Sequence, residues 1–141
     1  MTNRKLSATA TVIAISALAL TVFVPGAVAQ GRHFNFQIPF DFYAGGRLMP
    51  AGSYTVEHNS VGGVTQIYDR NGHVTTILPQ ASIKKAIGNN RMMFNRYGTM
   101  TFLSEVQWAQ SETGYKIQES TLERETRLGA APVRVAVQPQ K

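Results

Sequence analysis

The sequence predicts an all-β fold, a small antiparallel β-sandwich or β-barrel of seven to eight strands with a short C-terminal helix. Three observations predict it. Apolar residues recur at every second position in several short segments, Gly-rich turns separate these segments, and one stretch near the C-terminus has the pattern of a helix. Strands of this kind occur in sandwiches and in barrels, so both architectures stay open.

The first 29 of the 141 residues have the pattern of an export signal. Arg4 and Lys5 form a basic start, residues 12–24 are apolar, and a small-x-small site ends at Ala29, before Gln30. We therefore expect cleavage between Ala29 and Gln30 and a periplasmic or extracellular protein. The apolar run is short for a membrane span, and no later segment is as apolar, so we expect no transmembrane segment in the mature chain.

The composition of the expected mature chain, residues 30–141, limits the partners and the reactions that the protein can have. Losing Arg4 and Lys5 leaves 12 basic and 8 acidic residues and lowers the net charge from +6 to +4. In an exported protein this mild excess favours an anionic envelope component or a partner protein over nucleic acid. The sequence contains no Cys, which excludes disulfides, Cys-ligated zinc and thiol catalysis.

The first predicted strand region runs from Phe34 to Phe42. Its apolar residues, four Phe and one Ile, alternate with polar ones and therefore share one face. Pro39 cannot donate to a β-ladder, so it marks an edge, a bulge or a break between two short strands. The pair at 45–46, Gly-Gly, ends this region, and residues 48–52 have the composition of a turn.

The central segments predict two hairpins and two further strands. The first hairpin turns at residues 69–72, and the second turns at Gly98. Residues 81–87 suit a short strand or an irregular link, and the residues after Ser104 also suit a helical turn. The predicted strands are 53–58, 64–68, 74–78, 92–97, 100–108 and 115–118.

The C-terminal part changes character at Ser120. Ser120 followed by Glu123 is a capping box, which predicts a helix over 121–128 that Gly129 ends. We expect one domain over residues 30–128. The tail, residues 129–141, contains two Pro and is expected to be mobile.

Two groups of motifs resemble a known family. The first is the PFxFxxGGxxxPAGxYxV motif that begins at Pro39. The second combines residues 93–98 (Met-Phe-Asn-Arg-Tyr-Gly), residues 101–106 (Thr-Phe-Leu-Ser-Glu-Val) and residues 123–125 (Glu-Arg-Glu). The chain is similar to a large family of short exported bacterial proteins, many from soil bacteria, without an established activity. The resemblance implies an exported, compact, β-rich protein and implies no site residues.

One basic cluster is a candidate binding surface. No acidic residue lies between Arg70 and Glu105. If segments 81–87 and 92–97 pair across the turn at Gly88, their cations meet at one end of a sheet and can bind an anion or a partner. The alternative is a charged edge that prevents aggregation. The residues of this candidate site are Lys84, Lys85, Arg91 and Arg96.

Aromatic residues give a second candidate surface. Tyr97 and Trp108, with Tyr115, are candidates for stacking on a sugar or another ligand, although aromatic residues pack in cores more often.

Enzymatic motifs are missing from the sequence. His33, His58 and His73 lack the spacing of metal ligands, and no Gly-x-Ser-x-Gly segment or phosphate-binding loop occurs. We therefore expect no catalytic residues, metal or cofactor. A hydrolase or metal enzyme that uses His58 or Glu105 is kept as a third alternative.

These observations predict an exported, non-enzymatic protein that binds, or forms part of, the cell envelope and contacts anionic surfaces through the basic cluster. The main alternative is a small barrel that carries an apolar ligand in its interior. An exposed strand edge near Pro39 or in the tail also allows self-association.

Overall fold

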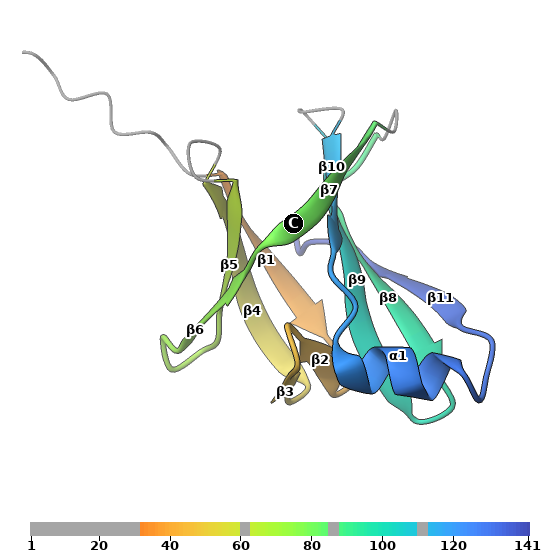
Figure 1. The fold of residues 1–141 in the computed structure, drawn as a ribbon. Helices are drawn as coiled ribbons and strands as arrows, with labels where there is room; N and C mark the ends of the chain where they lie inside the picture. Colours follow the sequence, from red (N-terminus) through yellow and green to blue (C-terminus); the bar gives the residue numbers. More distant parts are fainter. Residues whose placement is uncertain (1–31, 60–62, 85–87, 110–112) are drawn as a thin grey trace, which may run out of the picture.

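The computed structural model describes residues 32–59, 63–84, 88–109 and 113–141 (Figure 1). The predicted signal peptide, residues 1–29, and its cleavage site lie outside the described residues. The side chains of residue 32, residues 81–84 and residue 113 are also outside the description.

The described residues form two sheets that face each other (Figure 1). The four-stranded sheet has the order β1-β4-β5-β6 and is antiparallel throughout. Its strands are β1 (Arg32–Ile38), β4 (Gly52–Asn59), β5 (Val64–Tyr68) and β6 (Val74–Ile77).

The seven-stranded sheet has the order β11-β8-β9-β10-β7, and a short hairpin is attached to it. The hairpin consists of β2 and β3, and β2 lies parallel to β9 at the pair Tyr43 and Phe102. The strands of this sheet are β2 (Phe42–Ala44), β3 (Arg47–Met49), β7 (Pro79–Lys84), β8 (Arg91–Tyr97), β9 (Met100–Trp108), β10 (Thr113–Ile117) and β11 (Val133–Val137).

The predicted all-β class is confirmed, and the two sheets do not close into a barrel. The described residues form eleven strands rather than seven to eight. The strands that the prediction did not separate or include are β2, β3 and β11. Leu48 and Met49, expected in a turn, belong to β3, because the two Gly at 45 and 46 already reverse the chain with positive φ angles.

The core lies between the two sheets, and the alternating Phe34–Phe42 segment supplies much of it. Phe36, Ile38 and Phe42 are fully buried, and Phe34 and Phe40 pack against them. Pro39 lies between β1 and β2, as the missing N–H predicts. Strands β8 and β9 of the seven-stranded sheet contribute Met92, Phe94, Leu103, Val106 and Trp108.

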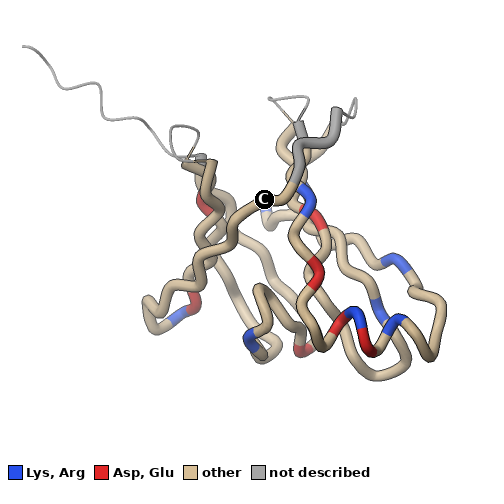
Figure 2. The backbone as a smooth tube through the Cα atoms, in the orientation of Figure 1, with Lys and Arg blue, Asp and Glu red and all other residues tan. Residues whose placement is uncertain are grey.

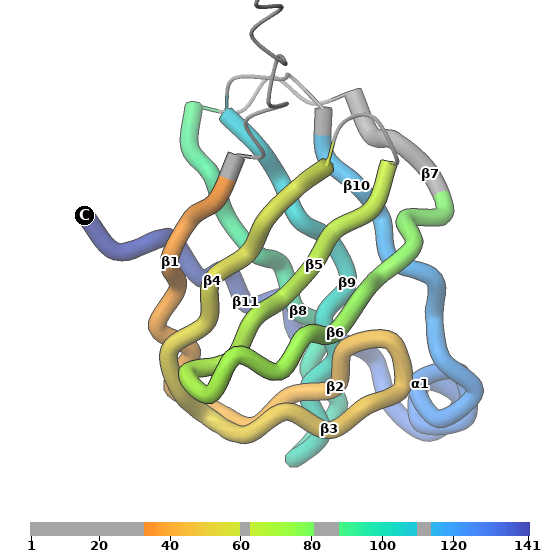
Figure 3. Tube along the Cα trace, turned by 90° about the vertical axis from the view of Figure 1, so that its left-hand side faces the viewer, coloured from red at the N-terminus to blue at the C-terminus, as the bar shows by residue number. Residues whose placement is uncertain are grey.

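The chain passes directly from one sheet to the other between β6 and β7 (Figures 1 and 3). Only Leu78 separates these strands, and its side chain is 70% exposed. β7 then pairs with β10 as far as Pro79 and Ile117, where the register shifts. Since Pro79 has no N–H to donate, the ladder ends there and the two segments diverge.

The prediction of a mobile tail over 129–141 is wrong for the part that forms β11. β11 pairs with β8, and Val135 and Val137 pack against the core. Beyond it, Pro139 forms a β-bridge with Phe36, and the N–H of Gln140 donates to the carbonyl of Asn35 at 2.8 Å. The tail is held because alternate Val residues cover an edge of the core that β8 leaves open.

The helix α1 (Thr121–Arg127) forms where the capping box predicts it. The N–H of Glu123 donates to the Oγ of Ser120 at 3.1 Å. The helix lies on the outer face of the seven-stranded sheet, where Asn95 Nδ2 donates to Glu123 Oε1 at 3.1 Å. Glu123 is only 3% exposed, and burial raises the pKa of its carboxyl despite the hydrogen bond from Asn95. In the described part of the chain, no helix has both the length and the apolar content to cross a bilayer.

Replacing Phe42 tests how far the two sheets depend on this ring. We expect Phe42→Ala to lower the free energy of unfolding by about 3–5 kcal/mol, because it removes a fully buried ring and leaves a cavity. The control is Leu128→Ala, at a side chain that is 82% exposed, with an expected change below about 0.5 kcal/mol. Urea unfolding measures both, and equal losses would contradict this account of the core.

The raised pKa of Glu123 predicts a pH effect on stability. A carboxyl whose pKa is higher in the folded state stabilises the fold below its unfolded value of 4.5, and this contribution is lost as pH rises through the folded pKa. Glu123→Gln keeps an acceptor for Asn95 and removes the charge. We therefore expect the stability of Glu123→Gln relative to wild type to increase from pH 4 to pH 7 in urea titrations. A constant difference would show that burial does not penalise the charge.

Candidate functional site

The structure does not bring the described residues of the predicted basic cluster together. The pairing of 81–87 with 92–97 on which this cluster depends is not found in the described part of these segments, because β7 pairs with β10, and β8 lies between β9 and β11. Lys84 ends β7, which is separated from β8 by the two strands β9 and β10, and Lys85 lies outside the described residues. Arg91 and Arg96 are at opposite ends of β8, about 16 Å apart along an extended strand.

Both arginines of β8 are engaged within the protein. The Nε of Arg91 donates to Gln107 Oε1. Arg96 donates from Nε to Thr101 Oγ1 at 3.2 Å, and its guanidinium lies 4.8 Å from the centre of the Phe40 ring, a cation–π contact. In Figure 2 the basic residues are distributed over the described chain rather than gathered at one end.

The candidate aromatic residues do not gather at one exposed surface, because Trp108 and Tyr115 lie on the core side near His58 and Tyr97 lies on the other face of the sheet. Trp108 is in the core between the sheets, where its ring is 5.5 Å from that of Phe34. Tyr97 is buried on the outer face of β8, and its ring is 5.9 Å from that of Phe102. Tyr115 lies on the core side, 4.3 Å from the His58 ring. These rings therefore do not form a common surface for stacking.

The residues of the enzymatic alternative occupy different faces. His58 lies between the sheets, with its ring near those of Tyr115 and Trp108. Glu105 alternates along β9 with the core residue Val106, so it points to the outer face. Among the described residues, no group of three or more His, Asp or Glu is arranged to hold a metal ion.

Glu105 belongs to a polar network on that outer face. Its Oε2 accepts from Gln107 Nε2 at 2.8 Å, and its Oε1 accepts from Arg134 Nη2 at 2.6 Å. Because Gln107 also accepts from Arg91, the network joins β8, β9 and β11. The Glu105 side chain is only 10% exposed, so these donors are needed to stabilise its carboxylate away from water.

The free edge of β6 borders a series of hollows that we call the edge groove. The first, about 40 Å³, lies between β3 and Thr75. The second, about 280 Å³, lies between the turn at Gly45, residues 76–78 and residues 117–120. The third, about 320 Å³, shares residues 118–119 with the second and extends to Arg124. Figure 3 shows the β2–β3 hairpin below β6 and next to α1.

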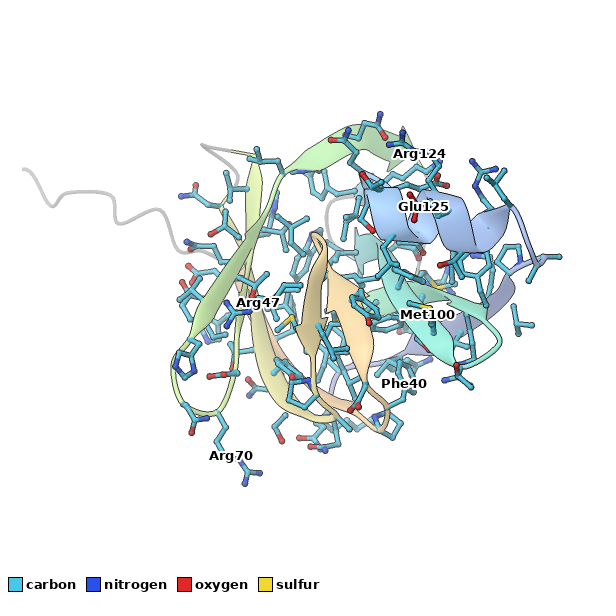
Figure 4. All side chains as sticks on the ribbon, turned by 60° about the horizontal axis from the view of Figure 1, so that its bottom comes forward. Phe40, Arg47, Arg70, Met100, Arg124 and Glu125 are labelled. Carbon is cyan, nitrogen blue, oxygen red and sulfur yellow. The ribbon has the colours of Figure 1, made fainter. Side chains whose placement is uncertain are left out.

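The groove is lined by three exposed cations from separate parts of the chain. They are Arg47 of β3, Lys116 of β10 and Arg124 of α1. No ion pair involves any of the three among the described residues. Figure 4 shows Arg47 beside β6 and Arg124 on α1, while Arg70 points away at the tip of the β5–β6 hairpin.

The two acids that line the groove are each paired. Glu119 Oε2 lies 3.4 Å from Arg127 Nε. Asp69 accepts from the N–H groups of Asn71 and His73, and its Oδ2 is 2.9 Å from His73 Nδ1. Burial raises the pKa of Asp69, but these hydrogen bonds outweigh it and hold the pKa below its ordinary value. Asp69 therefore stays negatively charged, but the lining carries three cations against two acids and Arg127 offsets the charge of Glu119, so the net charge that the groove offers is positive.

No family model, curated protein or solved structure matches this chain. The resemblance to a family of short exported bacterial proteins stays a prediction.

The sequence did not reveal the edge groove. Its cations come from positions 47, 116 and 124, and no spacing rule relates them. The available signal was Pro79, which marks the end of a ladder and therefore a place where two strands separate.

Arg134 gives a test of the outer polar network. We expect Arg134→Ala to lower the free energy of unfolding by about 1–3 kcal/mol, because it leaves the nearly buried Glu105 carboxylate with one donor fewer. The control, Arg70→Ala, changes an exposed hairpin residue and should cost less than about 0.5 kcal/mol. Urea unfolding of both variants is the measurement, and an equal loss in the two would contradict the network.

Proposed function

We propose that this protein is an exported, non-enzymatic binding protein of the cell envelope whose edge groove takes a negatively charged partner. The observation that carries the proposal is the charge of the groove. Arg47, Lys116 and Arg124 have no ion-pair partner among the described residues, whereas Glu119 is paired with Arg127, so the three cations outweigh the two acids of the lining. Opposite charge on a partner therefore complements the groove.

Export remains part of the proposal on the strength of the pattern in residues 1–29. The contact surface differs from the one that the sequence predicted, since Arg91 and Arg96 are engaged within the protein. The edge groove replaces the cluster of Lys84, Lys85, Arg91 and Arg96 as the proposed contact surface.

The packing between the two sheets favours a protein that binds its partner at the surface over one that carries a ligand in its interior. Large side chains occupy the space between the sheets, including Phe36, Phe42, Phe94 and Trp108. The hollows of the edge groove are instead open to solvent and lie at the margin of the core, where Ile77 and Ile117 are nearly buried.

Binding to three acidic probes tests the proposal. The protein is purified from its exporting host without detergent, and an intact mass that begins at Gln30 confirms processing. Its affinity is then measured for polyglutamate, alginate and phosphatidylglycerol vesicles. We expect binding to at least one probe and about a tenfold loss in the double variant Lys116→Glu with Arg124→Glu, because repulsion replaces attraction in the groove.

The matched control carries the same change of charge outside the groove. It is Arg70→Glu with Lys141→Glu, at two exposed residues on the β5–β6 hairpin and at the C-terminus. We expect it to weaken binding by less than about threefold, since screening limits the effect of distant charges. An equal loss of affinity in both double variants would show that binding depends only on the net charge of the protein. No binding to any probe would refute the proposal.

A further inference from the structure

The edge of β6 that borders the groove has no strand beside it in the described structure. β6 pairs with β5, and β3, on the other side of the groove, pairs with β2. In an antiparallel ladder, hydrogen-bonded and non-bonded pairs alternate. The N–H of Asp69 donates to the carbonyl of His73, so the alternation directs the N–H and C=O groups of Val74 and Thr76 away from β5, toward this edge.

An exposed row of backbone groups is the feature to which extended peptides add as a further strand. The groove follows this edge and its continuation from Thr75 to Gln80, about 20 Å of extended chain. A peptide of about seven residues spans that length. Since β6 ends at Ile77 and Pro79 cannot donate, its main-chain pairing is confined to β6, and contacts beyond Leu78 come from side chains.

The lining of the groove argues for a peptide rather than a lipid chain. Among its large aliphatic residues, Met49, Ile77 and Ile117 are nearly covered already, and the widely exposed ones, Leu48 and Leu78, lie in separate hollows. This leaves little apolar surface for an acyl chain, whose binding scales with the apolar area buried. The remaining lining offers backbone groups, amides and cations, which suit a peptide with acidic side chains.

We propose that the edge groove binds an extended acidic peptide that adds to β6 as a fifth strand of the four-stranded sheet. This inference rests on the proposed function and names the partner of the same site. Backbone pairing with Val74 and Thr76 holds the peptide, and acidic side chains contact Arg47, Lys116 and Arg124.

Four synthetic peptides test the inference. Each has about seven residues, blocked ends and Glu at alternate positions, with Val, Thr, Leu or Phe between them. A second set replaces every Glu with Lys. We expect wild-type protein to bind at least one acidic peptide and none of the basic ones, as measured by fluorescence anisotropy at physiological salt. Failure of all four acidic peptides to bind overturns the inference.

A proline substitution separates backbone pairing from charge. Thr76→Pro removes one outward N–H and none of the hydrogen bonds to β5, and an edge strand tolerates Pro at such a position. The matched control, Thr76→Ala, removes the same side chain and keeps the N–H. We expect affinity to fall about tenfold in Thr76→Pro relative to Thr76→Ala. Equal affinities would show that the peptide does not pair with β6.

Hydrogen exchange of the wild-type protein gives a second readout that needs no variant. Bound peptide is expected to slow exchange at the amides of Val74 and Thr76 and to leave exchange at the hydrogen-bonded amides of the β5–β6 turn unchanged. Unchanged exchange at both amides with the site saturated contradicts strand addition. If alginate or vesicles bind through Lys116 and Arg124 but the peptides do not, this inference fails and the proposed function stands.

Discussion

The two sheets depend on one aromatic contact, in which the buried ring of Phe42 lies between Tyr54 of the four-stranded sheet and Phe94 of the seven-stranded sheet. Each pair meets nearly edge to face with centroids 5.3 Å apart, an arrangement that aromatic rings favour. The next residue, Tyr43, points to the opposite face and stacks on Phe102. A shift of β2 by one residue would exchange these two rings, so the register of β2 is strongly determined. The β2–β3 turn at one side of the edge groove is positioned by the same contact.

The two margins of the sandwich differ, and the difference explains why the groove lies where it does. At one margin the C-terminal tail crosses from β11 to β1, and its bridge between Pro139 and Phe36 occupies the edge of β1. At the other margin the chain itself crosses from β6 to β7, and the ladder to β10 ends at Pro79. No described strand covers the edge of β6 beyond that point. The hollow is therefore a consequence of how the chain changes sheets, and the core residues Ile77 and Ile117 support it from below.

Local patterns predicted the elements well, because alternation and capping are properties of adjacent residues. The hairpin of β5 and β6, the hairpin of β8 and β9, and the helix after Ser120 all form as expected. Pairing between distant segments was not predictable from the sequence. β7 and β8 are neighbours in sequence but not in the sheet, so cations that are close in the chain were separated in space. The Val residues of β11 alternate as in any strand, but the two nearby Pro led to the prediction of a mobile tail. The partner strand, β8, was not apparent from the local sequence.

The electrostatics of the edge groove limit what kind of partner it can hold. Arg47, Lys116 and Arg124 are exposed, and an exposed ion pair contributes only about 0.2–1 kcal/mol, less as salt increases. Three such contacts do not compensate for the loss of translational and rotational freedom on binding, which costs about 4 kcal/mol or more. A small anion would therefore bind weakly and without selectivity. A partner that also uses the backbone groups of β6 gains contacts that salt does not screen. Those contacts depend on the strand direction and register of the partner, whereas the cations select its charge.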